Sequence, residues 1–284
     1  VIGWVTSIIQ QAEASQARIN EFLNVEPEIR NTNQNNTKIE GSIEFKNVSF
    51  TYDDTNITAL QNVSFKVIKG ETLAILGKTG SGKSTIISIL ARLYDCDKGV
   101  VNIDNQNIEN LNLDNLRQSI GFVPQDAFLF SDTIENNIKF GDKCANIDMI
   151  TQAAKNAYID HNIAAFADGY KTLVGERGVT LSGGQKQRVS IARAIIKNPK
   201  ILILDDCLSA VDTETEEIIL KNLERITKNR TTLIVSHRIS SIKHADKIIV
   251  LKEGQIIQEG THEDLSLKKG FYKELYEQQL LEES

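Results

Sequence analysis

A set of short, continuously apolar runs most constrains how this chain can fold. The runs occupy residues 73–76, 120–123, 201–204, 233–235 and 248–251, and stretches with helical patterning separate them. Strands that helices cover on both faces have such unbroken apolar sequences. The runs therefore predict an α/β fold whose core is a parallel sheet.

Two further regions differ from this core in their patterning. Around Phe45, Phe50 and Val63, apolar and polar residues alternate, as they do in half-buried antiparallel strands. Residues 126–190 have helical patterning without comparable strand runs, for example around Ile150. We expect an antiparallel β subdomain and an inserted helical subdomain beside the core sheet.

The first 38 residues have a different character from the rest of the chain. Helical spacing of apolar residues predicts a helix over residues 8–25, but the apolar start at 1–9 is far shorter than the roughly 20 residues that span a bilayer. Because the chain begins at Val1 rather than Met, we interpret this segment as the end of a last membrane-domain helix; an ordinary N-terminal helix of a soluble protein is the alternative. The Asn-rich stretch 31–36 is expected to be a flexible linker, and the compact domain to extend from 39 to 284.

The overall charge argues against a surface that attracts polyanions. The net charge of −6, from 32 basic and 38 acidic residues, creates no broad field that would attract nucleic acid or anionic lipid. Any phosphate must therefore be bound at a local site. The 3 cysteines lack C-x-x-C spacing, which argues against a zinc site or a disulfide framework and favours reduced, cytosolic thiols.

A glycine-rich segment that suits phosphate binding follows the apolar run 73–76 and precedes a helical pattern. It matches G-x-x-x-x-G-K-[ST], in which glycines let backbone N–H groups surround phosphates, the lysine reaches the β and γ phosphates, and the hydroxyl binds Mg²⁺. The pattern predicts a P-loop NTPase of the RecA-like type. The segment, called the P-loop below, consists of Gly77, Lys78, Thr79, Gly80, Ser81, Gly82, Lys83, Ser84 and Thr85.

Polar residues directly follow the other apolar runs. Gln125 comes after 120–123, Asp205 and Asp206 end the run from 201, and His237 comes after 233–235. Ligands of open α/β sheets bind at the carboxyl ends of the strands, so these residues are expected to line one crevice with the P-loop. Alone, the Asp pair would read as a turn or helix cap; beside a P-loop, Asp205 is interpreted as a Mg²⁺ ligand.

A second motif narrows the choice among P-loop proteins. Leu181 is followed by Ser182, Gly183, Gly184 and Gln185, called the signature below. Tyr52, Gln125, residues 209–212 with Asp212 at their end, and His237 accompany it in the expected order along the chain. With these residues, the chain from Ile39 onward closely resembles the nucleotide-binding domain of ABC transporters. The resemblance implies ATP hydrolysis with ATP and Mg²⁺ as cofactors.

In that family the signature contacts ATP that is bound to the opposite subunit. The resemblance therefore implies that two such domains meet head to tail around two ATP molecules, with Ser182, Gly183, Gly184, Gln185 and Asp212 acting in trans. It also implies that Tyr52 stacks on adenine, that Gln125 touches Mg²⁺ and the attacking water, and that His237 contacts the γ-phosphate.

For some of these residues a plainer interpretation stays open. By pattern alone Tyr52 is the last aromatic residue of a strand, and His237, one of only 4 His, is a surface residue. Phe128 and Phe130, after Gln125, would carry motion to membrane helices by the same resemblance. As isolated residues they would read equally well as core aromatics.

Two segments point to export. Residues 175–178 resemble the segment that in exporters links this domain to loops of the membrane domains, and the helix at 1–25 looks like the end of a fused membrane helix. They imply a half-transporter with membrane-spanning domains in the same full-length chain, located at the cytoplasmic face of the cell membrane. A soluble ABC-type ATPase that handles nucleic acid is the alternative, but no heptad run interrupts this chain. The transported substrate depends on membrane helices that this sequence lacks.

Asp206 departs from the family pattern, which usually has Glu as the base that polarises the attacking water. The carboxylate of Asp is retracted by about 1.5 Å, and misplacements of about 1 Å can cost about 10²-fold in rate. This favours the weaker site of a heterodimeric exporter. A homodimer with slow sites and a non-catalytic ATP clamp are the alternatives.

Overall fold

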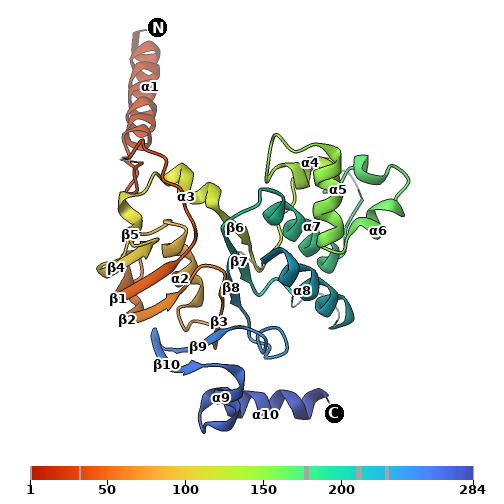
Figure 1. Ribbon diagram of the computed structural model, residues 1–284. Helices are drawn as coiled ribbons and strands as arrows, with labels where there is room; N and C mark the ends of the chain where they lie inside the picture. The colour runs from red at the N-terminus through yellow and green to blue at the C-terminus, as the bar shows by residue number, and fades with distance from the viewer. Residues whose placement is uncertain (1, 32, 176–178, 209–212, 228–229, 284) are drawn as a thin grey trace. The chain divides into compact units, whose positions relative to one another are not determined.

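The structure is a computed structural model of the 284-residue chain, and it describes residues 2–31, 33–175, 179–208, 213–227 and 230–283 (Figure 1). The chain divides into two compact units, Val1–Arg30 and Asn31–Ser284. In the first unit, helix α1 (Ile2–Leu23) has no buried residue, and Trp4 and Phe22 are exposed. No helix in the described part of the chain combines the length and apolarity needed to cross a bilayer.

The core of the second unit is a six-stranded sheet in the order β10-β9-β3-β8-β7-β6. Strands β9, β3, β8, β7 and β6 pair in parallel and only β10 pairs antiparallel, with β9. Each apolar run lies in one strand, so the predicted parallel core is confirmed. The strands are β3 (Thr72–Gly77), β6 (Ile120–Val123), β7 (Ile201–Asp205), β8 (Thr231–Val235), β9 (Lys247–Lys252) and β10 (Gln255–Gly260).

A second, four-stranded antiparallel sheet has the order β2-β1-β4-β5, as the alternating pattern predicts. Its inward side chains include Phe45 and Phe65, which stack with ring centroids 4.5 Å apart. Because both rings are almost fully buried, they anchor β1 to β2. The strands are β1 (Ile43–Tyr52), β2 (Ile57–Val67), β4 (Lys98–Ile103) and β5 (Gln106–Asn107).

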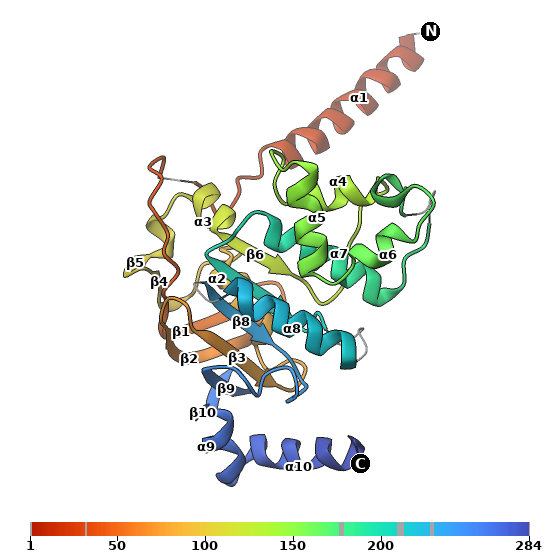
Figure 2. The same cartoon turned by 45° about the vertical axis from the view of Figure 1, so that its right-hand side comes forward.

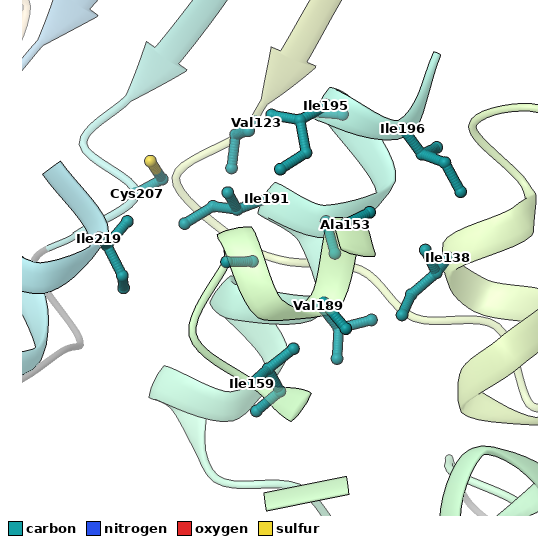
Figure 3. Close-up of a cluster of buried hydrophobic side chains, with 14 of the residues drawn as sticks. Val123, Ile138, Ala153, Ile159, Val189, Ile191, Ile195, Ile196, Cys207 and Ile219 are labelled. Atoms are coloured by element: carbon teal, nitrogen blue, oxygen red, sulfur yellow. The ribbon is translucent and has the colours of Figure 1, made fainter. Parts of the chain in front are cut away.

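Helices flank the core sheet along the chain. Helix α2 follows β3, α3 precedes β6, and α7 and α8 lie on either side of β7 in sequence. Apolar clusters fill the space between these layers, and in one of them Ile191, Cys207 and Ile219 meet (Figure 3). The flanking helices are α2 (Lys83–Leu90), η1 (Ile108–Asn110), α3 (Leu113–Ser119), α7 (Gly183–Ile196), α8 (Thr213–Thr227), α9 (His262–Leu267) and α10 (Phe271–Glu283).

The segment expected to be helical contains helices and no strand of either sheet among its described residues. Figures 1 and 2 both show these helices gathered in one group beside the core sheet. They are α4 (Ile134–Lys139), α5 (Ile147–Asn156), α6 (Asp160–Ala164) and η2 (Gly169–Lys171), and α7, which packs on α4 and α5, continues past residue 190 to Ile196.

The Asn-rich stretch, expected to be a flexible linker, is tied to the domain by hydrogen bonds. Asn31 Oδ1 accepts from Leu113 N at 3.0 Å, and Asn33 Nδ2 donates to Asn110 O at 2.7 Å. Asn112 Nδ2 donates to Asn33 O at 2.8 Å. Asn side chains carry both donors and acceptors, so they can satisfy the start of α3 without burying apolar surface. These bonds attach the predicted linker to the domain at Asn31 and Asn33.

Candidate functional site

A cleft of about 850 Å³ opens at the carboxyl ends of β3, β7 and β8. The segments predicted to converge there do so, because the P-loop, Gln125, Asp205, Asp206 and His237 all line the cleft. Tyr52 and Ile57, from the antiparallel sheet, line it as well. Both sheets of the second unit therefore contribute walls to the same site.

The P-loop backbone requires glycine where it turns into α2. Gly82 has φ +103°, and a Cβ at this position would lie 2.5 Å from Ala59 O. Gly82 is also the N-cap of α2, and it offers no side-chain acceptor to the first N–H groups of the helix. An uncapped helix N-terminus is suited to an anion, so this end of the cleft fits a phosphate group.

The buried hydroxyl of Ser81 is a second feature that fits a phosphate group in this cleft. Its side chain is 4% exposed, and within the described part of the chain its Oγ has no hydrogen-bond partner. Buried hydroxyls are nearly always paired, and an orphan in a phosphate-binding motif fits a ligand oxygen. The P-loop therefore has an unmet donor as well as an uncapped helix end.

Lys83 currently bonds to the loop itself. Its Nζ donates to Gly77 O at 2.8 Å and to Lys78 O at 2.9 Å. Burial lowers the pKa of Lys83, and the carboxylates of Asp205 and Asp206 oppose that shift. A half-buried cation held in this way would gain stronger, charge-assisted hydrogen bonds from a phosphate.

The acidic side of the cleft fits a divalent cation. Burial first, and then the neighbouring charge of Asp206, raise the pKa of Asp205, while Lys83 lowers it. Two carboxylates thus face one lysine. The hydroxyl of Ser84 and the amide of Gln125 line the same cleft, and such oxygen donors, completed by water and phosphate, are the set that Mg²⁺ prefers. Among the described residues, no group of three or more His, Cys, Asp or Glu side chains could hold a metal, so a cation here would need the hydroxyl, the amide, water and phosphate as further ligands.

Asp206 and His237 form a bonded pair. His237 Nδ1 lies 3.0 Å from Asp206 Oδ2, and the two side chains are 56% and 12% exposed. The backbone of Asp206 has φ +43°, and its N–H donates to Val235 O at 2.7 Å. A non-glycine residue in this left-handed region is strained, and such strain gathers at functional sites. Sequence patterns did not predict this conformation.

Tyr52 contacts the end of the P-loop. Its hydroxyl lies 3.1 Å from Thr85 Oγ1, and its ring meets Phe50 and Tyr94 edge to face at 4.9 and 5.4 Å. These contacts fix the ring at the wall of the cleft. Its role as an adenine platform stays a prediction.

The signature does not line this cleft. Ser182 caps α7: its Oγ accepts from Gln185 N at 3.3 Å, while Gln185 Oε1 accepts from Ser182 N at 3.0 Å. Gly183 and Gly184 form the first turn of α7, and that N-terminus is partly satisfied internally. Asp212 with 209–211, and residues 176–178 of the segment resembling an exporter link, lie outside the described residues.

Gln187, which no sequence pattern singled out, connects the signature helix to the cleft. This side chain is 4% exposed, and its Nε2 donates to Gln125 O. No sequence pattern marked it, because a buried Gln on a helix looks like any other polar residue until its partner is known. The bond joins α7 to the residue expected to contact Mg²⁺.

The aromatic residues after Gln125 are at the surface. Phe128 is 64% and Phe130 39% exposed, so the interpretation as core aromatics is wrong. Phe140, which the sequence analysis did not single out, is 57% exposed and lies 4.7 Å from Phe130 between ring centroids. Arg193 packs against the Phe130 and Phe140 rings at 5.6 and 5.9 Å. We call Phe128, Phe130 and Phe140 the aromatic patch.

Comparison with known proteins is consistent with this geometry. The family model described as "ABC transporter" matches residues 60–209. Two proteins of Bacillus subtilis (strain 168) are each 46% identical: "Uncharacterized ABC transporter ATP-binding protein YknU" over 98% of this chain, and "Probable multidrug resistance ABC transporter ATP-binding/permease protein YheI" over 99%. Each alignment covers 48% of the relative, so the chain spans about half the length of these curated relatives.

Among solved structures, the "Structure of a bacterial Atm1-family ABC exporter with ATP bound" superposes with a TM-score of 0.91 at 40% identity. The match covers 98% of this chain and 49% of that one. The likeness therefore extends over almost the whole of the chain.

Proposed function

Because this chain belongs to the ABC transporter family, as an ATP-binding domain of the exporter type that acts as an ATPase, we propose that it powers the export of a substrate across a membrane. The observation that carries the proposal is the shared cleft, in which the P-loop, the Asp205–Asp206 pair and His237 meet. The relative YheI is named as an ATP-binding/permease protein, which supports membrane-spanning domains in the same full-length chain. In this proposal the domain lies at the cytoplasmic face of the cell membrane.

In the proposed mechanism the phosphoryl group of ATP is transferred to water. Lys83 and the P-loop N–H groups hold the β and γ phosphates, and Ser84, Gln125 and Asp205 hold Mg²⁺. When bound, Mg²⁺ neutralises charge on the phosphates. Asp206, or a residue of a partner, orients the attacking water, and His237 contacts the γ-phosphate.

The domain is proposed to work as a head-to-tail dimer. Ser182, the glycines after it and Gln185 lie outside the cleft of their own chain, and a second domain could bring its signature to that cleft. A heterodimer is favoured over a homodimer, because Asp206 shortens the expected base while the signature is intact.

The aromatic patch is the proposed contact with the membrane-spanning domains. Three exposed rings close together are unusual for a surface that faces only water. They follow Gln125 in sequence, and Gln187 and Arg193 both tie this region to α7, so movement at the patch and at the signature would be coupled. No nucleic acid partner is proposed.

Equilibrium titration of the full-length protein with Mg-ATP tests the site. Lys83→Ala removes the lysine whose Nζ sits inside the P-loop, and hydrogen bonds to charged groups contribute about 1.5 to 3 kcal/mol, so the affinity should fall at least about 10-fold. Lys98→Ala, an exposed lysine of β4 that does not line the cleft, is the matched control and should leave binding unchanged. Equal affinity of Lys83→Ala and wild-type protein would refute the site.

A further inference from the structure

The C-terminal helix α10 contacts the loop that carries His237. Gln279 on α10 bonds this loop twice: its Nε2 donates to His237 O, and its Oε1 accepts from Ile239 N, both at 2.8 Å. A carboxamide offers a donor and an acceptor on one rigid plane, and these two bonds use one of each. Gln279 thus fixes the backbone at His237 and two residues beyond it.

The other side of the same loop is fastened to the cleft. His237 Nδ1 lies 3.0 Å from Asp206 Oδ2, and Ser236 Oγ accepts from Arg238 N at 3.0 Å. The side chain of His237 therefore responds to two anchors, one inside the cleft and one on α10. If the outer anchor is lost, the backbone of the loop is freed on the α10 side, and the ring is held by its bond to Asp206.

Contacts at the start of helix α10 hold it in place against the rest of the domain. At its start Tyr272 is fully buried, with its hydroxyl 2.8 Å from His262 Nδ1 and its N–H donating to Gln258 Oε1 at 3.0 Å. The ring of Phe271 lies 5.9 Å from Lys78 Nζ of the P-loop. One helix therefore reaches the phosphate-binding loop at its first turn and the His237 loop near its end.

We propose that Gln279 is a positioning residue that orients His237 toward the γ-phosphate and so lets the site distinguish ATP from ADP. The inference rests on the γ-phosphate contact of His237 in the proposed function. Gln279 does not line the cleft, so it acts only through the His237 loop. Because ADP lacks the γ-phosphate, a displaced His237 weakens ATP and leaves ADP binding as it was.

The test is photoaffinity labelling of the full-length protein with 8-azido-ATP on ice, where hydrolysis is slow, with unlabelled ATP or ADP as competitors. The label is quantified in the gel band of this chain alone. ATP bound at the P-loop of a different partner chain therefore does not contribute to the signal. Gln279→Met keeps a straight side chain of similar length and helix propensity but removes both hydrogen bonds. We expect a loss of about 3- to 10-fold in ATP affinity, and an ADP affinity within about 1.5-fold of wild type.

Two comparisons decide the outcome. Glu274→Ala changes an exposed residue on the same helix and should behave as wild type. His237→Ala should show the same selective loss of ATP, and adding Gln279→Met to it should cause no further loss, because both changes act through one contact. Equal weakening of ATP and ADP in Gln279→Met, or an unchanged ATP affinity beside a selective loss in His237→Ala, would overturn the positioning role. If His237→Ala itself keeps the preference for ATP, the γ-phosphate role of His237 fails, and the role of Gln279 fails with it.

Discussion

The ring of Tyr52 stands at the wall of the cleft with its hydroxyl 3.1 Å from Thr85 Oγ1. This position predicts two different contributions to ATP binding, a flat π face for the base and a polar contact to the P-loop helix. Tyr52→Phe removes only the second, and Tyr52→Ala removes both. The two contributions can therefore be separated by substitution.

We expect Tyr52→Ala to weaken ATP binding by about 1 to 3 kcal/mol, the usual effect of losing one base–aromatic stack. Tyr52→Phe and Tyr52→Trp should bind almost as well as wild type, because each keeps an aromatic face. The measurement is equilibrium titration with ATP and, as a control ligand without a base, with tripolyphosphate, whose affinity Tyr52→Ala should lower no more than Tyr52→Phe does. An equal loss of ATP affinity in all three variants would mean that Tyr52 only supports the fold.

Among the elements, the strands were the most predictable from sequence and the contacts between distant elements were the least. A run such as 201–204 is apolar because both faces of β7 are buried, and the residues at its end are polar because the strand stops at the cleft. The site could therefore be predicted from local patterns. The bonds of Gln279 to the His237 loop and of Gln187 to Gln125 join residues far apart in sequence, and no local pattern marks such a partner.

Helix α7 combines several of these long-range contacts. It begins at the signature, and near its end Arg193 Nη1 donates to Phe128 O while its Nε and Nη2 donate to Asn137 O and Oδ1, all at 2.8 Å. Asn137 is fully buried, and burial lowers the pKa of Arg193, which nevertheless keeps its charge. The guanidinium thus connects α7 to α4 and to the aromatic patch.

Arg193→Ala should lower the free energy of unfolding by about 2 to 4 kcal/mol, because it breaks a buried network and leaves Asn137 short of donors. Arg193→Lys should also destabilise, since one ammonium cannot reproduce the planar fork. Chemical denaturation of the full-length protein measures the effect, with Lys186→Ala on the same helix as the control. Stability of Arg193→Ala within about 0.5 kcal/mol of wild type would show that the network contributes little.

For the whole molecule, the proposed dimer would have two nucleotide sites, and Asp206 bears on how ATP hydrolysis is divided between them. The carboxylate of Asp206 is held by His237, and its backbone is fixed by Val235 O, so this short side chain has little freedom to move toward a water. The signature on the same chain keeps all of its residues. These two facts are compatible with a slow homodimer and with a heterodimer in which this chain completes the better site of its partner.

Steady-state ATPase of the full transporter, measured separately for each variant, distinguishes the two assemblies. In a homodimer, Asp206→Glu should restore reach toward the water and raise turnover, and Asp206→Asn should abolish the remaining activity. In the favoured heterodimer, Asp206→Asn should leave most of the turnover, because hydrolysis occurs at the partner's site. Ser182→Ala or Gly183→Asp should then remove it, since the signature acts in trans on the γ-phosphate there. Near-complete loss of turnover with Asp206→Asn would contradict the heterodimer, because there the partner's site supplies most of the turnover and this substitution leaves that site unchanged.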